Sequence, residues 1–207
     1  MGLVRRKGIE LVDAAEPKQP GDCADLIASL EDLDPQERRN AAREIAHCPG
    51  AVDALVSRLK REQDAAVREV ILTALVRIDD PSSASGMAEC LRSEDAALRN
   101  EVIEAIGLLT GDVSTTMRSL LADSDPDIRI FAVNILDSRR EPDVESWLIE
   151  VIEHDAHLNV CATAVDLLCE AGTEASLDPL DRLKERFAAD SFIQFAANRA
   201  IKRIRGV

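Results

Sequence analysis

The chain has 207 residues, enough for one ordinary domain or for one array of small units with a continuous core. Hydrophobic residues make up 46% of it and aromatic residues only 2%, so the interior must be aliphatic, which suits packed helices better than sheets. The net charge of −14 argues against nucleic acid or an anionic membrane surface as a partner, because both repel an acidic protein.

The chain has no apolar stretch close to the roughly 20 residues that a membrane-spanning helix needs, and its N-terminus lacks an apolar core of signal-peptide length. We therefore expect a cytoplasmic protein. The cysteines are odd in number and include no C-x-x-C pair, which favours reduced thiols over a disulfide framework. We expect all of them to pack as small hydrophobic side chains: Cys23, Cys48, Cys90, Cys161 and Cys169.

In chain order, a polar N-terminal arm over residues 1–20 precedes a domain over residues 21–207 in which two kinds of segment alternate. Segments of the first kind are apolar and cover residues 22–30, 51–59, 83–91, 114–121, 143–152 and 178–187. Each precedes an aspartate, and these recur at spacings of 30, 31, 30, 30 and 35 residues: Asp34, Asp64, Asp95, Asp125, Asp155 and Asp190. A regular period of this length indicates a repeat architecture.

The segments that follow these aspartates have the apolar spacing of an amphipathic helix. Apolar residues stand three, seven and eleven positions after the aspartate in most units, with Glu37 and Asp166 as exceptions. An aspartate in this place caps a helix, because its carboxylate accepts hydrogen bonds from first-turn N–H groups; Pro35 and Pro126 suit the first helical position. Each unit is therefore predicted to be a helix A, a tight turn and a helix B.

A lone pair of helices cannot bury both of its faces, so neighbouring units must stack. The sequence thus predicts an all-α fold, an α-solenoid of six stacked helix-turn-helix repeats. In the last unit, the Asp178-Pro179 pair predicts a capped start for helix A as well.

Two stretches of the chain, LEDLDPQERRNAAREI at residues 30–45 and LADSDPDIRIFAVNIL at residues 121–136, resemble HEAT repeats. The period of about 30 is similar to that of the short HEAT-like type first associated with phycobilisome lyases, rather than the longer ~40-residue form. The resemblance implies a structural role, a ladder between adjacent turns, for the first four aspartates and for the arginines four positions later: Arg38, Arg68, Arg99 and Arg129. The last two units depart from it at Asn159 and Gln194, which suggests a changed contact between repeats or a C-terminal cap.

Candidate chemistry is sparse. In the segment EVIEHDAHL, Glu150 lies four residues before His154 and Glu153 lies four before His157, a spacing compatible with a metal site on a helix. The segment straddles the turn at Asp155, so solvated turn residues are the preferred interpretation. Some HEAT-like enzymes bind iron through His-Glu doublets, and this sequence has none. We expect no catalytic residue, no cofactor and no metal, and hence no enzyme.

Positions five and nine after each aspartate point away from the apolar face of helix B, so they are predicted to form an exposed surface for a partner protein. The fifth positions change from polar to apolar along the array: Arg39, Glu69, Asn100, Ile130, Val160 and Phe195. The ninth positions stay mostly polar: Arg43, Thr73, Glu104, Asn134, Ala164 and Arg199. An apolar strip of Ile130, Val160 and Phe195 with a polar border is typical of a protein-binding groove.

In two alternatives the strip does not bind a different protein: the N-terminal arm covers it, or a second copy of the chain covers it in a homo-oligomer. The leading hypothesis is a non-catalytic scaffold or adaptor that binds another protein along the helix-B surface. The rival is an accessory subunit of a bilin lyase or a related chromophore-handling enzyme, which the repeat type implies and for which Arg39 and Arg43 could supply basic groups. A DNA-processing role would need a basic stripe, which the net charge of −14 disfavours.

Overall fold

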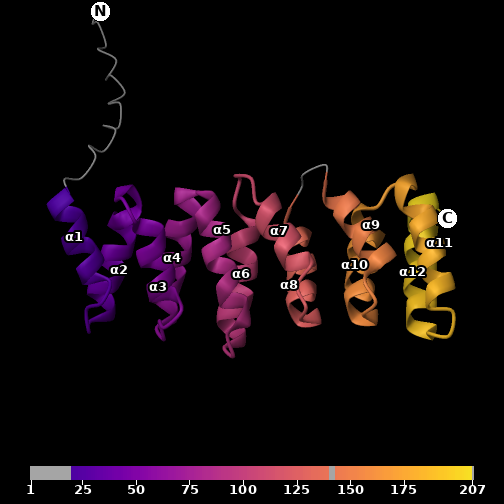
Figure 1. Cartoon of the computed structure of the whole chain (residues 1–207), viewed down its shortest axis with the longest axis horizontal. Coiled ribbons are helices and arrows are strands. Elements are labelled where there is room, and N and C mark those ends of the chain that lie inside the picture. Colours follow the sequence, from indigo (N-terminus) through magenta and orange to yellow (C-terminus); the bar gives the residue numbers. More distant parts are fainter. Residues whose placement is uncertain (1–19, 140–142, 207) are drawn as a thin grey trace, which may run out of the picture.

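The computed structural model describes residues 20–139 and 143–206, and within these ranges the ordered elements are all helical. The predicted N-terminal arm thus lies outside the described residues, apart from its last residue. The helix pairs stand side by side along one axis, with α1 and α2 at one end and α11 and α12 at the other (Figure 1). The A helices are α1 (Pro20–Ser29), α3 (Ala51–Leu59), α5 (Pro81–Ala88), α7 (Ser114–Leu121), α9 (Val144–His154) and α11 (Leu177–Arg186). The B helices are α2 (Pro35–Glu44), α4 (Ala65–Ile78), α6 (Ala96–Gly107), α8 (Pro126–Asp137), α10 (Leu158–Ala171) and α12 (Ser191–Arg205).

The predicted α-solenoid of six helix pairs is confirmed. The B helices form a continuous layer, since α2 packs on α4, α4 on α6, α6 on α8, α8 on α10 and α10 on α12. The A helices form a second layer, in which α3 packs on α5, α5 on α7, and α9 on α11. Aliphatic side chains fill the space between the layers, and Ile71, Ile106 and Leu136 of three successive B helices are almost completely buried.

Aspartate caps start the B helices as predicted in five of the six units. The Asp34 carboxylate accepts a 2.8 Å hydrogen bond from the Gln36 backbone N–H, and Pro35 occupies the first turn of α2. The carboxylate also accepts a hydrogen bond from a first-turn N–H at the other four caps: Asp64, Asp95, Asp125 and Asp190. Each such cap contributes about 1 kcal/mol to helix stability, so the repeated aspartate defines where the turn between A and B ends.

In the fifth unit the predicted cap is wrong, because α10 begins two residues late, with His157 and not Asp155 at the N-cap position. Asp155 instead accepts a 2.8 Å hydrogen bond from the His157 N–H, just as Asp32 does from Asp34 in the first unit. The helical register therefore shifts by two positions. Leu168 occupies the buried place eleven after the cap, which explains why Asp166 interrupts the apolar pattern counted from Asp155.

The predicted cap at Asp178 is also wrong. A short 3₁₀ turn over Glu174–Ser176 leads directly into α11, whose N-cap residue is Ser176. Asp178 lies in the first turn of the helix and Pro179 is buried within that turn. A proline is tolerated there, since first-turn N–H groups have no intrahelical partner in any case.

Arginines four positions after the caps tie neighbouring units together, as the resemblance implies. Arg38 forms two hydrogen bonds with the Glu62 carboxylate of the next unit, at 2.8 and 2.9 Å, and Arg129 does the same with Asp155 at 2.6 and 3.0 Å. Burial opposes ionisation of Glu62, but hydrogen bonds from Arg38 and Arg58 outweigh it and lower the pKa of Glu62 to about 2. These are paired charges inside the array.

The ladder varies where the acidic partner changes. Arg68 pairs with Glu101 at 2.8 Å and with Asp95 at 3.3 Å. Arg99 donates a 2.6 Å hydrogen bond to the Ser93 carbonyl and lies over the Phe131 ring, with 5.6 Å from guanidinium carbon to ring centroid. After the register shift, Cys161 and not Asn159 stands four after the cap of α10. The unit-five departure is therefore a cysteine in the arginine column.

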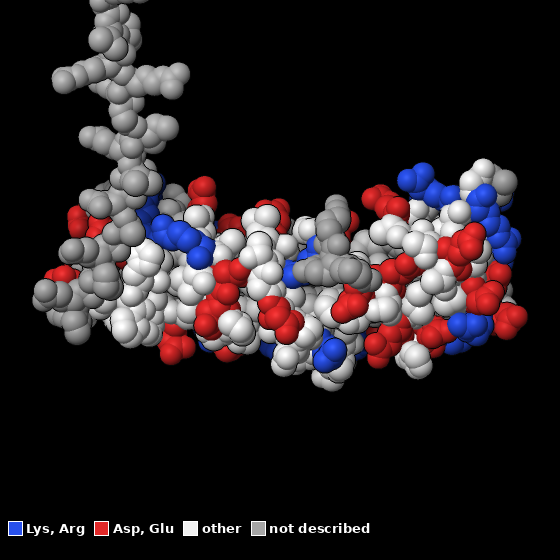
Figure 2. Space-filling view, turned by 90° about the horizontal axis from the view of Figure 1, so that it is seen from above, with Lys and Arg blue, Asp and Glu red and all other residues white. Residues whose placement is uncertain are grey.

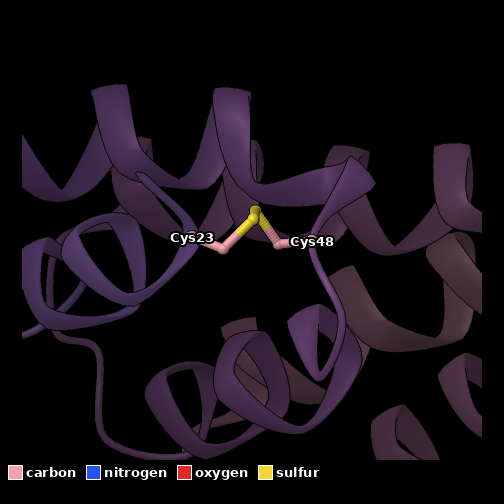
Figure 3. Close-up of a disulfide and its surroundings, with 2 residues drawn as sticks. All are labelled: Cys23 and Cys48. Carbon is pink, nitrogen blue, oxygen red and sulfur yellow. A yellow bond between two sulfur atoms is a disulfide. The ribbon is translucent and has the colours of Figure 1, made fainter. Parts of the chain in front are cut away.

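Two of the five cysteines contradict the prediction of reduced thiols. Cys23 in α1 and Cys48, just after the 3₁₀ turn that extends α2, form a disulfide with their Cα atoms 5.5 Å apart (Figure 3). Cys90, Cys161 and Cys169 are free and buried, as expected of packing residues. Burial raises the pKa of Cys90 to about 11, so this thiol stays protonated and unreactive at neutral pH.

Candidate protein-binding surface

The predicted surface residues of the B helices lie where the array leaves the B layer uncovered, with exceptions in α10. Seven are exposed: Arg43, Glu69, Thr73, Asn100, Glu104, Phe195 and Arg199. Three are half-buried: Arg39, Ile130 and Asn134. These residues share one face because they are spaced by four, or by one repeat, along helices that run side by side. We refer to this face as the B-helix surface.

The predicted apolar strip on this surface does not exist. Val160 is completely buried, because the two-residue shift of α10 places it three after the true cap, at an inward-facing position. Ala164 is buried for the same reason. Position nine of α10 is instead Asp166, which is exposed and pairs with Arg199 of α12 at 2.6 Å. Ile130 packs partly against the core. Of the three predicted strip residues, only Phe195 is well exposed, at 66%.

One hollow on the B-helix surface is a groove of about 670 Å³ between α4 and α6. Apolar side chains and the small Ala65 and Ala66 line its base, and Leu108, which directly follows α6, is 65% exposed there. Its polar lining consists of Glu69, Thr73, Glu101 and Glu104. Sequence reasoning identified Glu69 and Glu104 but missed Leu108, which lies thirteen positions after its cap and outside the two columns.

The charges of this groove are mostly uncompensated. Glu101 is paired with Arg68 of α4. Arg77, on the last turn of α4, donates its hydrogen bond to the Arg43 carbonyl on α2. Among the ion pairs of the described residues, none involves Glu69 or Glu104. The groove therefore presents two free carboxylates beside an apolar base.

Basic residues are concentrated at the two ends of the B layer. At the first end, Arg43 is exposed, and Arg39 makes only a long 3.5 Å contact with Gln36 while its Nε is buried without a hydrogen-bond partner. At the other end, α12 carries Arg199, Lys202, Arg203 and Arg205. Seen from above, Asp and Glu are spread along the whole array, and Lys and Arg are visible at both ends and near the middle (Figure 2).

A second hollow lies in the A layer, between α7 and α9. This cleft has a volume of about 570 Å³. Leu121 of α7 faces Trp147 and Val151 of α9 across it, with Arg118 and Glu150 at its edges. Trp147 is the only tryptophan of the chain, and sequence reasoning did not select it.

The candidate metal residues at the end of α9 serve structural contacts. The His154 Nδ1 lies 3.0 Å from the backbone oxygen of Glu150, not beside its carboxylate. Glu153 forms an ion pair with Arg182 of α11, and His157 is the N-cap residue of α10. Across residues 20–139 and 143–206, no group of three or more His, Cys, Asp or Glu side chains is placed to hold a metal ion.

Comparisons with known proteins concern the repeat. A family model for HEAT repeats matches residues 23–107 and 114–203. One similar solved structure is an engineered protein, with 19% identity and a TM-score of 0.41, covering 89% of this chain and 97% of its own. A designed armadillo repeat protein in complex with a (KR)4 peptide is 17% identical, with a TM-score of 0.42, covering 88% of this chain and 99% of its own.

The complex of CpcE and CpcF of phycocyanin lyase from Nostoc sp. PCC7120 is also similar, at 17% identity and a TM-score of 0.37, covering 96% of this chain and 100% of that one. These likenesses are weak in sequence and describe the fold alone. No significant match was found among curated proteins. None of the described helices is both long and apolar enough to cross a membrane.

Proposed function

Because the chain belongs to the HEAT repeat proteins, with most of its length matched by that family, we propose that it is a non-catalytic scaffold that binds a partner protein along its B-helix surface. The observation that carries this proposal is the α4–α6 groove. This groove lies on the B layer and is lined by the exposed Leu108 and by two carboxylates without an ion-pair partner. A rigid frame with an uncovered face is what an adaptor needs, since little order must be created on binding.

The proposed contact residues are those that the structure leaves accessible on this face: Arg39, Arg43, Glu69, Asn100, Glu104, Ile130, Asn134 and Phe195. Val160 no longer belongs to this set, because its side chain is buried. Leu108 joins it. A contiguous apolar surface with a polar border marks an interaction site, whereas a lone exposed leucine does not; Leu108 belongs to the apolar lining of the groove.

The test is affinity capture from the source cell with the immobilised chain, comparing Leu108→Asp with the matched control Leu33→Asp. Leu33 is 96% exposed in the turn before α2, so both variants replace an exposed leucine with a carboxylate. We expect a partner retained by the parent and by L33D to be lost by L108D, with equal helical content in circular dichroism. Retention of the same partner by all three folded proteins would refute binding at this face.

An oligomer that covers the B-helix surface is the main alternative occupant. Light scattering coupled to gel filtration distinguishes the cases, because a second copy seated on this face would make the dimer sensitive to L108D. A monomer in both parent and variant leaves the surface available to a different protein.

The second candidate function, an accessory subunit of a bilin lyase or related chromophore-handling enzyme, has one structural observation in its favour. The α7–α9 cleft combines an aromatic ring, apolar walls and the Arg118 guanidinium, which suits a flat pigment with carboxylate groups. Binding there would quench the fluorescence of Trp147, the single tryptophan, and shift the absorbance of the added bilin. Neither change in the parent, or equal changes in Arg118→Ala, would exclude this site.

A further inference from the structure

The α4–α6 groove has a chemical polarity that specifies its occupant further. Its base is formed by Leu72, Val76, Ala105 and Leu108, and only acidic and neutral side chains stand around it. The nearest arginines of these helices are engaged elsewhere, Arg68 with Glu101 and Asp95 and Arg77 with the Arg43 carbonyl. Glu69 and Glu104 take part in none of the ion pairs of the described residues.

From this geometry we propose that the groove binds a partner segment in which basic side chains flank a large apolar side chain. The apolar residue would lie against Leu108 and the aliphatic base. Lys or Arg on either side would reach the carboxylates of Glu69 on α4 and Glu104 on α6. The inference rests on the proposed function, since it names the class of partner for the same surface.

The apolar base argues against two simpler occupants. A small cation gains nothing from Leu108, and two separate carboxylates are too few ligands for a metal ion. An acidic segment would meet Glu69 and Glu104 at close range, where like charges repel.

Helix α12 of a second copy has the same combination of basic and apolar side chains and is therefore an alternative occupant. That helix carries Arg199, Lys202, Arg203 and Arg205 together with the exposed Phe192 and Phe195. Such a contact would join unlike surfaces, so the copies would assemble head to tail into a ring or an open filament. A synthetic peptide distinguishes the two occupants, because peptide binding and self-association of the chain are measured independently.

The probe is a fluorescent twelve-residue peptide that repeats Lys-Leu-Arg, compared with one in which every Lys and Arg is Glu and one in which every Leu is Ser. Binding is measured by fluorescence polarisation at low and high salt. We expect the Lys-Leu-Arg peptide to bind best, both substituted peptides to bind weakly, and the affinity to fall with salt because exposed charges are screened.

The decisive variant is Glu69→Gln with Glu104→Gln, and its matched control is Glu174→Gln with Glu185→Gln. The control pair is exposed at the far end of the array and changes the net charge equally. Exposed ion pairs each contribute up to about 1 kcal/mol, so the groove variant should bind the Lys-Leu-Arg peptide about five- to tenfold more weakly than the control. A fall of similar size is expected for Leu108→Ser.

Equal affinity of the groove and control variants, or a preference for the acidic peptide, would overturn the inference. Loss of partner capture in L108D together with no peptide binding would reject the basic class of partner and leave the proposed function standing. A concentration-dependent oligomer of the parent that disappears in the Glu69→Gln, Glu104→Gln variant would identify a second copy as the occupant, which also overturns the inference.

Discussion

The Cys23–Cys48 disulfide should contribute strongly to the stability of the first repeat. It closes a loop with a sequence separation of 25 residues. In the chain-entropy model, closing a loop of that size in the unfolded state contributes about 3.5 kcal/mol at 25 °C. Besides the disulfide, α1 and the turn after it are held by the buried Leu30 and by Leu26, which packs partly against the core.

The perturbation is either reduction of the parent or the double change Cys23→Ala with Cys48→Ala. We expect the free energy of unfolding of the first unit to fall by up to about 3.5 kcal/mol, with smaller changes further along the array, because each repeat contacts only its neighbours. Hydrogen exchange followed by mass spectrometry measures this by segment. The amides of α1 should lose protection, and those of α8 should keep theirs.

The double variant supplies the control, since a reductant has no disulfide to act on there. Quantitative alkylation of Cys23 and Cys48 in the native, non-reduced parent would refute the reasoning at its first step. Unchanged exchange of α1 after full reduction would refute the second step, the assignment of the stability of this unit to the cross-link.

Three further predictions concern the buried Glu62 and the cap of α10. Glu62→Gln should lower the free energy of unfolding by about 3–5 kcal/mol in a urea titration, because it leaves the buried Arg38 guanidinium without its counter-charge. Since the pKa of Glu62 is lowered to about 2, its contribution is complete above its usual range near 4.5 and is lost as pH falls toward 2, so the parent should destabilise in acid more steeply than E62Q. His157→Ser should raise the free energy of unfolding by about 0.5–1 kcal/mol by supplying the side-chain cap that α10 lacks, whereas His154→Ser, on the last turn of α9, should not. An unchanged midpoint for H157S would contradict the assignment of His157 as the cap.

The repeat architecture was predictable because its causes are local. A capping aspartate and apolar residues at spacings of three, four and seven act within a single helix, so they can be counted along the chain. The stacking of units follows from the same pattern, as one helix pair cannot bury both of its faces. For this reason the fold class and the caps of α2, α4, α6, α8 and α12 were within reach, whereas the arginine ladder between units was implied by the resemblance to HEAT repeats.

The errors lie where distant segments determine the outcome. The sequence pattern places Asp155 at a cap. In the structure its carboxylate accepts hydrogen bonds from Arg129 of the previous unit, and α10 begins two residues later, after His157. That shift of two residues moved Val160 from the surface to the core, since helical faces depend on phase. The disulfide likewise depends on α1 lying beside the end of the first B segment.

The sequence alone therefore determined that this chain is a row of helix pairs with an acidic character, because composition and helical periodicity are properties of short segments. The position of the α4–α6 groove depends on how α4 and α6 pack, and its lining includes the exposed Leu108 together with Glu69 and Glu104. Periodicity identifies the face of a helix that is turned outward, but the depth of a groove depends on the side chains of two helices that are about 30 residues apart in the chain.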